Sequence, residues 1–231
     1  KSIYQFISQR TSKTNPTILI GRDIRTSSPS LFEKAKNALI EAGSKVVDAG
    51  LVSTPTFYYA VFSKGYDGGM QISASHNPKE YNGIKIVMNS PKGLIKIGKT
   101  TGMEDIKNLS LQGVNPKSPG GDISSLENIT ENEVENSLGI TGNPNIKEFK
   151  IVADPANAMG ALYIDALFNK IPGNLIKMNF ELDGTFPAHQ PDPLQSETLV
   201  DLQKRVVEEK ADIGLAPDGD GDRLFFIDEK G

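Results

Sequence analysis

One stretch of this sequence organises the rest of the chain: Met70-Gln71-Ile72-Ser73-Ala74-Ser75-His76-Asn77-Pro78-Lys79-Glu80-Tyr81-Asn82-Gly83-Ile84-Lys85. Apolar residues at both ends predict two strands, and Asn77-Pro78 and Asn82-Gly83 predict turns between them. The intervening loop carries a hydroxyl, an imidazole, two amides and an ammonium group, which is more chemistry than a connection between core strands needs. Ser75 is the candidate nucleophile, because it stands where the chain leaves a rigid strand.

The loop resembles a known active site. Residues 73–78, followed by residues 81–85, are similar to the active-site serine loop of the α-D-phosphohexomutases, a family that includes phosphomannomutase/phosphoglucomutase and phosphoglucosamine mutase. In that family the loop serine gives a phosphoryl group to a sugar phosphate and takes it back. The resemblance implies that Ser75 is phosphorylated, that Lys85 is the acid/base and that His76 helps to position the phosphate.

Length and composition predict a two-domain protein of an ordinary soluble type. The chain has 231 residues, a net charge of −4 and no cysteine, which excludes disulfides and thiol catalysis. The mild acidity counts against a nucleic-acid binder, and no apolar run approaches the ~20 residues of a membrane span. No signal peptide is visible at the N-terminus. We therefore expect a cytoplasmic protein with neither nucleic acid nor membrane as partner.

Expected strands and helices alternate along the chain. This alternation predicts an α/β fold with mixed, mainly parallel sheets flanked by helices. We expect strands at 17–20, 45–48, 69–72, 84–88, 149–154, 175–178, 212–216 and 224–227, and helices near 3–7, 28–42, 54–61, 130–138, 162–168 and 197–209. In the second of these helices, the apolar stripe is expected to be Leu31, Ala35, Ala38 and Ala42.

A turn-rich stretch, residues 113–122, is expected to be a loop or linker between two domains. The two domains are then residues 1–127 and 128–231. The sequence stops directly after an expected strand, so we expect the natural protein to continue.

A second functional signal is Pro217-Asp218-Gly219-Asp220-Gly221-Asp222-Arg223. If the three carboxylates converge at about 4 Å, each pair repels by roughly 4 kcal/mol at an effective dielectric constant of 20, and a hard cation such as Mg²⁺ relieves that repulsion. An acidic surface turn without metal has the same spacing. An EF-hand calcium loop is excluded, because Arg223 stands where that loop requires glycine and an expected strand follows instead of a helix.

A third stretch, Gly93-Leu94-Ile95-Lys96-Ile97-Gly98-Lys99-Thr100, matches the P-loop pattern of nucleotide-binding ATPases. We reject a P-loop NTPase because bulky, β-branched residues favour extended backbone, whereas a loop that wraps phosphate needs small residues that expose N–H groups. We expect a turn at 91–93, a short strand, and then a helix from Thr101.

The family resemblance extends over both expected domains. Residues 218–223 are similar to the metal-binding loop of the phosphohexomutases, which implies that Mg²⁺, one per chain, is bound by the Ser75 phosphate and by Asp218, Asp220 and Asp222. Arg223 is implied as a cation beside the moving phosphoryl group.

Two further stretches, residues 21–28 and 183–193, also resemble family motifs. In the first, Arg22 and Arg25 are candidate phosphate ligands ahead of a helix N-terminus, although Arg22 and Asp23 can instead form an ion pair that fixes the loop. In the second, we expect His189, alone among prolines, to be structural.

The activity implied is that of a phosphohexomutase, which interconverts hexose 1-phosphate and 6-phosphate through a phosphoserine and a bisphosphate intermediate. Hexose phosphates are the implied small-molecule partners and hexose 1,6-bisphosphate the implied activator. The chain corresponds to the first two of the family's four domains, so alone it is expected to be poorly active. Tyr81-Asn82-Gly83 favours the phosphomannomutase/phosphoglucomutase type, with phosphoglucosamine mutase and a non-catalytic metal- and phosphate-binding module as alternatives. The sequence leaves the oligomeric state open.

Overall fold

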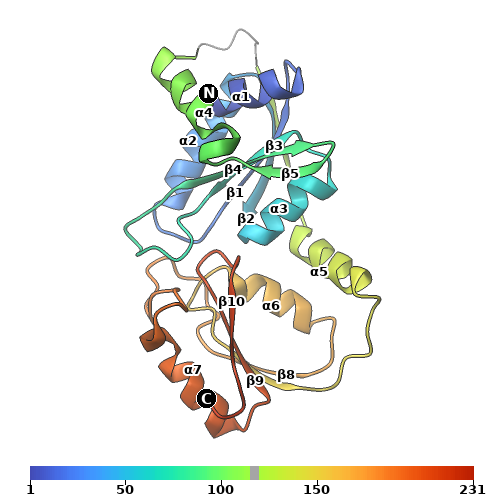
Figure 1. Cartoon of the computed structure of the whole chain (residues 1–231), viewed down its shortest axis with the longest axis vertical. Coiled ribbons are helices and arrows are strands. Elements are labelled where there is room, and N and C mark those ends of the chain that lie inside the picture. Colours follow the sequence, from blue (N-terminus) through green and yellow to red (C-terminus); the bar gives the residue numbers. More distant parts are fainter. Residues whose placement is uncertain (115–119) are drawn as a thin grey trace.

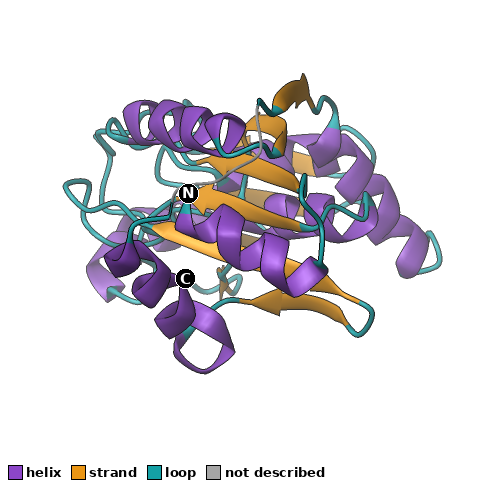
Figure 2. Cartoon of the chain, turned by 90° about the horizontal axis from the view of Figure 1, so that it is seen from above, coloured by secondary structure: helices purple, strands orange, loops and turns teal. Residues whose placement is uncertain are grey.

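The computed structural model describes residues 1–114 and 120–231 and contains two β-sheets, one in each half of the chain (Figure 1). Each sheet is mixed, mainly parallel and flanked by helices, which confirms the α/β fold expected from the sequence. Figure 2 shows helices above and below the strands.

The first sheet has the strand order β5-β4-β3-β1-β2-β6. Strands β4 and β5 run antiparallel to their neighbours, and the other four are parallel. Its strands are β1 (Thr17–Arg22), β2 (Lys45–Leu51), β3 (Gly68–Ile72), β4 (Ile84–Ser90), β5 (Gly93–Lys96) and β6 (Asp122–Ser125). Its helices are α1 (Ser2–Thr11), α2 (Ser28–Glu41), α3 (Thr54–Ser63) and α4 (Glu104–Gln112), the last preceded by a π-helical turn (Lys99–Met103).

The second sheet has the order β10-β9-β7-β8, with β10 antiparallel to β9. Its elements are α5 (Ile129–Ile140), β7 (Lys150–Ala153), α6 (Gly160–Phe168), β8 (Asn174–Lys177), the 3₁₀ turn η2 (Ser196–Leu199), α7 (Val200–Glu209), β9 (Ile213–Pro217) and β10 (Leu224–Ile227).

In each sheet the chain adds its second strand on one side of the first strand and its third strand on the other side, so its direction across the sheet reverses. Strand β2 lies on one side of β1 and β3 on the other, and right-handed crossovers therefore put α2 and α3 on opposite faces. Separate apolar clusters confirm this, since Phe32 and Leu39 belong to one cluster and Phe57 and Val61 to another. The same reversal around β7 separates α6 from α7. Loops at the carboxyl ends of strands that meet at such a reversal are the usual place for a site.

The expected apolar stripe of α2 is confirmed for Ala42, which is buried, and for Ala35, which packs against the core, but it is wrong for Leu31. Leu31 is 38% exposed, whereas Phe32 is 4% and Leu39 1% exposed. These two large side chains, seven residues apart, cover the sheet, because they bury more apolar area than the alanines on which the expected stripe was based.

The stretch that matches a P-loop pattern is extended. Residues 93–96 form β5, which pairs antiparallel with β4, and Ile97 is buried in the core. The rejection of a P-loop is therefore confirmed. The helix expected from Thr101 follows, as the π-helical turn and then α4.

The linker expected at residues 113–122 ends earlier than expected. Residues 115–119 of this stretch lie outside the described residues. Asp122 begins β6, which pairs parallel with β2 at the edge of the sheet. All four residues of β6 are exposed, so the sequence carries no apolar period to mark a strand.

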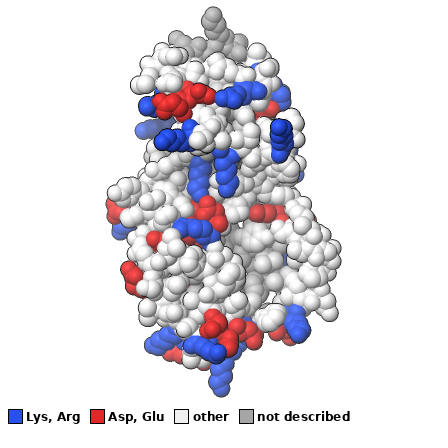
Figure 3. All heavy atoms as spheres, viewed as in Figure 1, with Lys and Arg blue, Asp and Glu red and all other residues white. Residues whose placement is uncertain are grey.

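The two sheets present their carboxyl ends to each other. Residues 73–83 (the serine loop) follow β3, residues 218–223 (the aspartate loop) follow β9, and the two loops meet between the halves (Figure 1). Helix α5 contacts both α3 and α6, so it also joins the halves. On the face shown in Figure 3, acidic and basic side chains are interspersed. No helix within residues 1–114 and 120–231 is long and apolar enough to cross a membrane.

Candidate active site

The serine loop holds its nucleophile in an uncommon backbone conformation. Ser75 has φ 55°, in the left-handed region that non-glycine residues rarely occupy. Its N–H donates to the Ser73 hydroxyl at 3.0 Å, and His76 Nδ1 lies 3.4 Å from Ser75 Oγ. Such a conformation persists only where its surroundings enforce it, and it occurs often at functional sites.

The aspartate loop brings its three carboxylates together. One oxygen from each of Asp218, Asp220 and Asp222 lies within 4.8 Å of the others. Asp218 and Asp220 are fully buried, whereas Asp222 is exposed. Ser75 Oγ donates a hydrogen bond to Asp218 Oδ2 at 2.9 Å. The expected nucleophile of the first half therefore touches the expected metal-binding loop of the second.

Two cations offset the charge of these carboxylates. Arg223 donates from Nε and Nη2 to Asp218 Oδ2 at 3.0 and 2.8 Å. Lys85 Nζ contacts Asp220 Oδ2 at 2.5 Å and Asp222 Oδ2 at 2.7 Å. The structure thus gathers Ser75, Lys85 and Arg223 around the three aspartates, and His76 lies beside Ser75.

Burial and charge shift the pKa values here in predictable directions. Burial raises the pKa of Asp218, the nearby Asp220 charge raises it further, and the hydrogen bond from Arg223 opposes both. Burial alone would lower the pKa of Lys85, but Asp220 and Asp222 outweigh it and raise that pKa above its usual value. Lys85 is therefore a charged ion-pair partner in this arrangement.

The donor set fits a hard divalent cation. Asp220 Oδ1 is buried and has no hydrogen-bond partner within the described part of the chain, which leaves a carboxylate oxygen open to a ligand. The other oxygen accepts from Lys85 and from the Thr54 hydroxyl. Carboxylate oxygens alone, with a phosphate to complete the shell, suit Mg²⁺ better than zinc.

Thr54 is a residue that sequence analysis missed. Besides its hydroxyl contact, its backbone N–H donates to the Asp220 carbonyl at 2.9 Å. Thr54 is the first residue of α3, so the positive end of that helix faces the acidic loop. The Thr54-Pro55 start of the helix was visible in the sequence, but its partner, 166 residues away, was not.

The contacts of Arg25 argue against the phosphate-binding role expected for it. The side chain is fully buried, and each of its five N–H groups already donates to an acceptor. The acceptors are the Asp23 carboxylate and the carbonyls of Ser75, Asn77, Pro78 and Tyr81. Arg25 therefore fixes the path of the serine loop and has no donor left for a phosphate.

Arg22 lies on the same segment and is half-buried. Its Nη1 donates to the Asp23 carbonyl at 3.3 Å. The Asp23 carboxylate pairs with Arg25 at 3.2 Å, so the ion pair considered for this loop forms with Arg25 and not with Arg22.

His189 is held by a buried carboxylate. Its Nε2 lies 3.1 Å from Asp154 Oδ2, and its Nδ1 lies 3.0 Å from the Gln190 carbonyl. Asp154 also accepts from the Asn179 amide and the Ala156 N–H. The contacts agree with the expected structural role, because they tie together the loops that follow β7 and β8.

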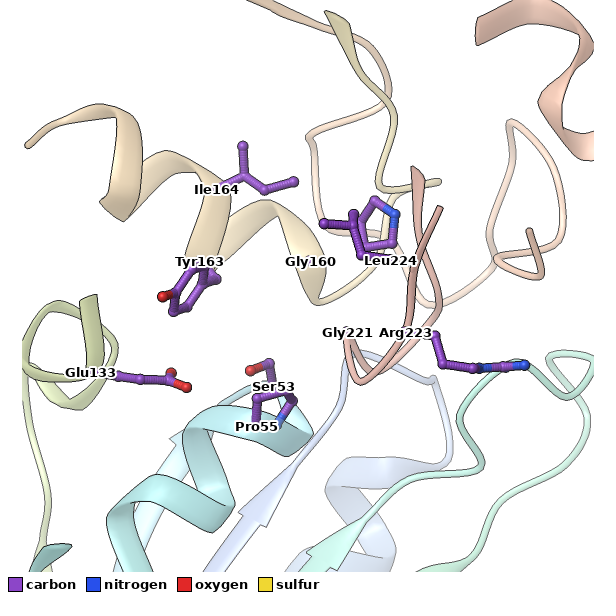
Figure 4. A pocket seen from close by; sticks show the side chains of 10 residues that line it. Ser53, Pro55, Glu133, Gly160, Tyr163, Ile164, Gly221, Arg223 and Leu224 are labelled. Carbon is purple, nitrogen blue, oxygen red and sulfur yellow. The ribbon is translucent and has the colours of Figure 1, made fainter. Parts of the chain in front are cut away.

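A cavity of about 270 Å³ lies beside the aspartate loop (Figure 4). It is lined by Ser53, Pro55, Glu133, Gly160, Tyr163, Ile164, Pro217, Gly221, Arg223 and Leu224. The Glu133 carboxylate accepts from the Thr56 hydroxyl at 2.5 Å, and burial raises its pKa. The described lining does not include Ser75 or the three aspartates, so the candidate site is not this cavity.

Comparisons with family sequence profiles match both halves of the chain. The profile described as phosphoglucomutase/phosphomannomutase, alpha/beta/alpha domain I, matches residues 1–107. The profile of domain II of the same description matches residues 130–231.

Individual proteins of this description are also similar to the chain. The chain is 35% identical over 240 residues to a phosphomannomutase of Vibrio cholerae, covering 100% of this chain and 50% of that protein. It is 31% identical to a phosphomannomutase/phosphoglucomutase of Pseudomonas aeruginosa, covering 97% and 46%. A crystal structure of a phosphoglucomutase/phosphomannomutase family protein from Burkholderia thailandensis superposes with TM-score 0.85 at 29% identity, covering 100% and 50%. The chain thus spans about half the length of the curated relatives it matches.

Proposed function

This chain belongs to the phosphoglucomutase/phosphomannomutase family, and from that premise we propose that it supplies the phosphoryl-transfer centre of a phosphohexomutase. The observation that carries the proposal is the 2.9 Å hydrogen bond from Ser75 to Asp218, which joins a nucleophile to a metal-binding loop across the two halves. The reaction is interconversion of hexose 1-phosphate and 6-phosphate, of the phosphomannomutase/phosphoglucomutase type. We also propose that the two domains are residues 1–127 and 128–231.

Ser75 is the group that is phosphorylated and dephosphorylated. In the first step the bond from phosphorus to Ser75 Oγ breaks and a bond to a sugar hydroxyl forms, giving a hexose bisphosphate. After the bisphosphate reorients, Ser75 Oγ attacks its other phosphate and releases the product. Hexose 1,6-bisphosphate activates the protein because it can phosphorylate Ser75 directly.

Lys85 is the proposed acid/base. It takes the proton of the attacking hydroxyl and returns it to the leaving oxygen. Because Asp220 and Asp222 hold it charged, Lys85 has to leave these carboxylates and release a proton to solvent before it can accept one from the attacking hydroxyl. His76, 3.4 Å from Ser75 Oγ, positions the phosphoryl group. Arg223, which pairs with Asp218, supplies positive charge beside it, and Arg22 is a further proposed phosphate ligand.

Asp218, Asp220 and Asp222, with a phosphoserine oxygen, are the proposed ligands of one Mg²⁺ ion. The ion would neutralise charge on the moving phosphoryl group. The open oxygen of buried Asp220 is the feature that favours a bound cation over a plain acidic turn.

Replacing Asp220 with asparagine is expected to weaken Mg²⁺ binding at least tenfold, because one ligand charge is lost while the side chain keeps its shape. The measurement is titration calorimetry on the Ser75-phosphorylated and unphosphorylated chains, with tighter binding expected for the phosphorylated form. The matched control is Asp228→Asn, since Asp228 is exposed and lies outside the aspartate loop. Equal Mg²⁺ affinity in both variants and the wild type would mean that the loop is only an acidic turn.

The function itself is tested by a coupled mutase assay on this chain and on a longer chain of the length of its relatives. Both are expected to take phosphate from a hexose 1,6-bisphosphate, but only the longer chain should turn over mannose and glucose 1-phosphates rapidly. Positioning of the reacting groups contributes roughly 7–11 kcal/mol in well-oriented reactions. We propose that the further length present in the relatives supplies the groups that orient the distal phosphate. No mutase activity in the longer chain would refute the proposal, and glucosamine phosphate as its preferred substrate would favour the phosphoglucosamine mutase alternative.

A further inference from the structure

We propose that Gln190 is a positioning residue that holds the serine loop from the second half of the chain, an inference that rests on the proposed function of Ser75. Gln190 Nε2 donates to the carbonyl of His76, the residue after Ser75, at 2.9 Å. The bond spans 114 residues of sequence and crosses between the two halves.

The residue after Gln190 holds the other loop. The Pro191 carbonyl accepts from the Gly219 N–H at 3.0 Å, and Gly219 lies between two of the aspartates. Two adjacent residues, Gln190 and Pro191, therefore bind the serine loop and the aspartate loop respectively. The distance between the Gln190 amide and the Pro191 carbonyl therefore sets the distance between Ser75 Oγ and Asp218.

The two loops are also in close backbone contact. A Cβ on Gly219 would lie 2.4 Å from the Ser75 carbonyl oxygen, so only glycine fits at this position without a shift. The Ser75 carbonyl accepts from Arg25 on its other side. The Ser75 carbonyl is thus held by Arg25 of the first half, and the next carbonyl, of His76, is held by Gln190 of the second half. Ser75 itself has the left-handed backbone conformation.

The segment that carries Gln190, residues 183–190, is itself fixed against Arg25. Gly184 pairs with Arg25 in a parallel β-bridge, and a Cβ on Gly184 would lie 2.2 Å from the Ile24 carbonyl oxygen. The Phe186 ring centroid lies 5.3 Å from Arg25 Cζ, in cation–π range. Gln190 therefore extends from a fixed base, as a positioning residue must.

The Gln190→Glu variant tests this directly, because glutamate keeps the shape but has no N–H to donate and sets a charged oxygen against the His76 carbonyl. We expect single-turnover phosphorylation of Ser75 by glucose 1,6-bisphosphate to slow at least tenfold. The amide NMR signals of Ser75, His76 and Asn77 should shift in ¹⁵N-labelled protein, while the melting temperature changes little, since Gln190 is half-buried. Gln190→Met, which lacks the donor and adds no charge, should slow phosphorylation in the same direction.

The matched control is Gln203→Glu, the same change in charge on α7, and it should alter neither the rate nor those signals. Three results would each overturn the inference. The Ser75 and His76 signals could stay unchanged in Gln190→Glu, or they could shift while the phosphorylation rate stays unchanged. The third is a loss of rate in Gln203→Glu equal to that in Gln190→Glu. If the wild-type chain takes no phosphate, the proposed function fails, and the amide signals alone decide whether Gln190 orders the serine loop.

Discussion

Replacing Ser75 with alanine is expected to abolish the uptake of phosphate from a hexose 1,6-bisphosphate, because Ser75 Oγ is the proposed acceptor. Removal of a nucleophile in a covalent enzyme lowers the rate by up to about 10⁶-fold, so no phosphoprotein should accumulate. The measurement is intact mass spectrometry before and after incubation, with peptide mapping of the modified residue in the wild type.

The control for this loss is Ser90→Ala. Ser90 donates to the Gly93 carbonyl in the turn between β4 and β5 and, within the described residues, makes no hydrogen bond to the aspartate loop, so this variant should be phosphorylated normally. Phosphate mapped to Ser73 or Ser90 in the wild type, with Ser75 unmodified, would contradict the assignment. A Ser75→Ala variant with an unchanged melting temperature would show that the loss is chemical and not a failure to fold.

Replacing Arg25 with methionine is expected to lower the free energy of unfolding by about 3–5 kcal/mol, because it leaves the buried Asp23 charge without its partner. The variant also strips hydrogen bonds from the serine-loop carbonyls, and each unsatisfied buried group adds to the loss. Urea unfolding followed by circular dichroism measures the change. Arg25→Lys keeps the charge but cannot donate in five directions, so it should recover only part of the stability.

Arg10→Met supplies the comparison for Arg25. Arg10 pairs with Asp105 at 2.9 Å, but both side chains are more than half exposed, so its removal should cost about 0–1 kcal/mol. If the two variants lose equal stability, Arg25 does not hold the loop as its contacts indicate. In the Arg25 variants that remain folded, phosphate uptake at Ser75 should also slow, because the path of the loop is no longer fixed.

The features that the sequence predicted well are those that depend on residues near one another in the chain. The alternation of strands and helices, the serine loop and the aspartate loop each depend on residues that are close together in the chain, so short patterns identify them. The stripe of α2 was right for Ala35 and Ala42. It included the exposed Leu31 and missed Phe32 and Leu39, because the large side chains determine which face is buried. The strand β6 was missed because all of its side chains are exposed and its pairing with β2 is through backbone.

What the sequence could not predict is how distant residues meet. Whether the Arg25 guanidinium faces a phosphate or a ring of carbonyls depends on the path of a loop some fifty residues later. The contact of Thr54 with Asp220 and that of Gln190 with His76 likewise join residues more than a hundred positions apart. A residue type such as arginine or glutamine does not by itself reveal which of these roles it has.

The bond between Ser75 and Asp218 also has a consequence for how the protein is made. The two residues are 143 positions apart in sequence. At translation rates of about 5–20 residues per second, Asp218 is synthesised roughly 7–30 s after Ser75. During that interval the nascent first half can form β1 to β5, but the Ser75 hydroxyl does not yet have the Asp218 carboxylate to bind. The proposed phosphate transfer at Ser75 therefore has to wait until β9 and the aspartate loop have been translated.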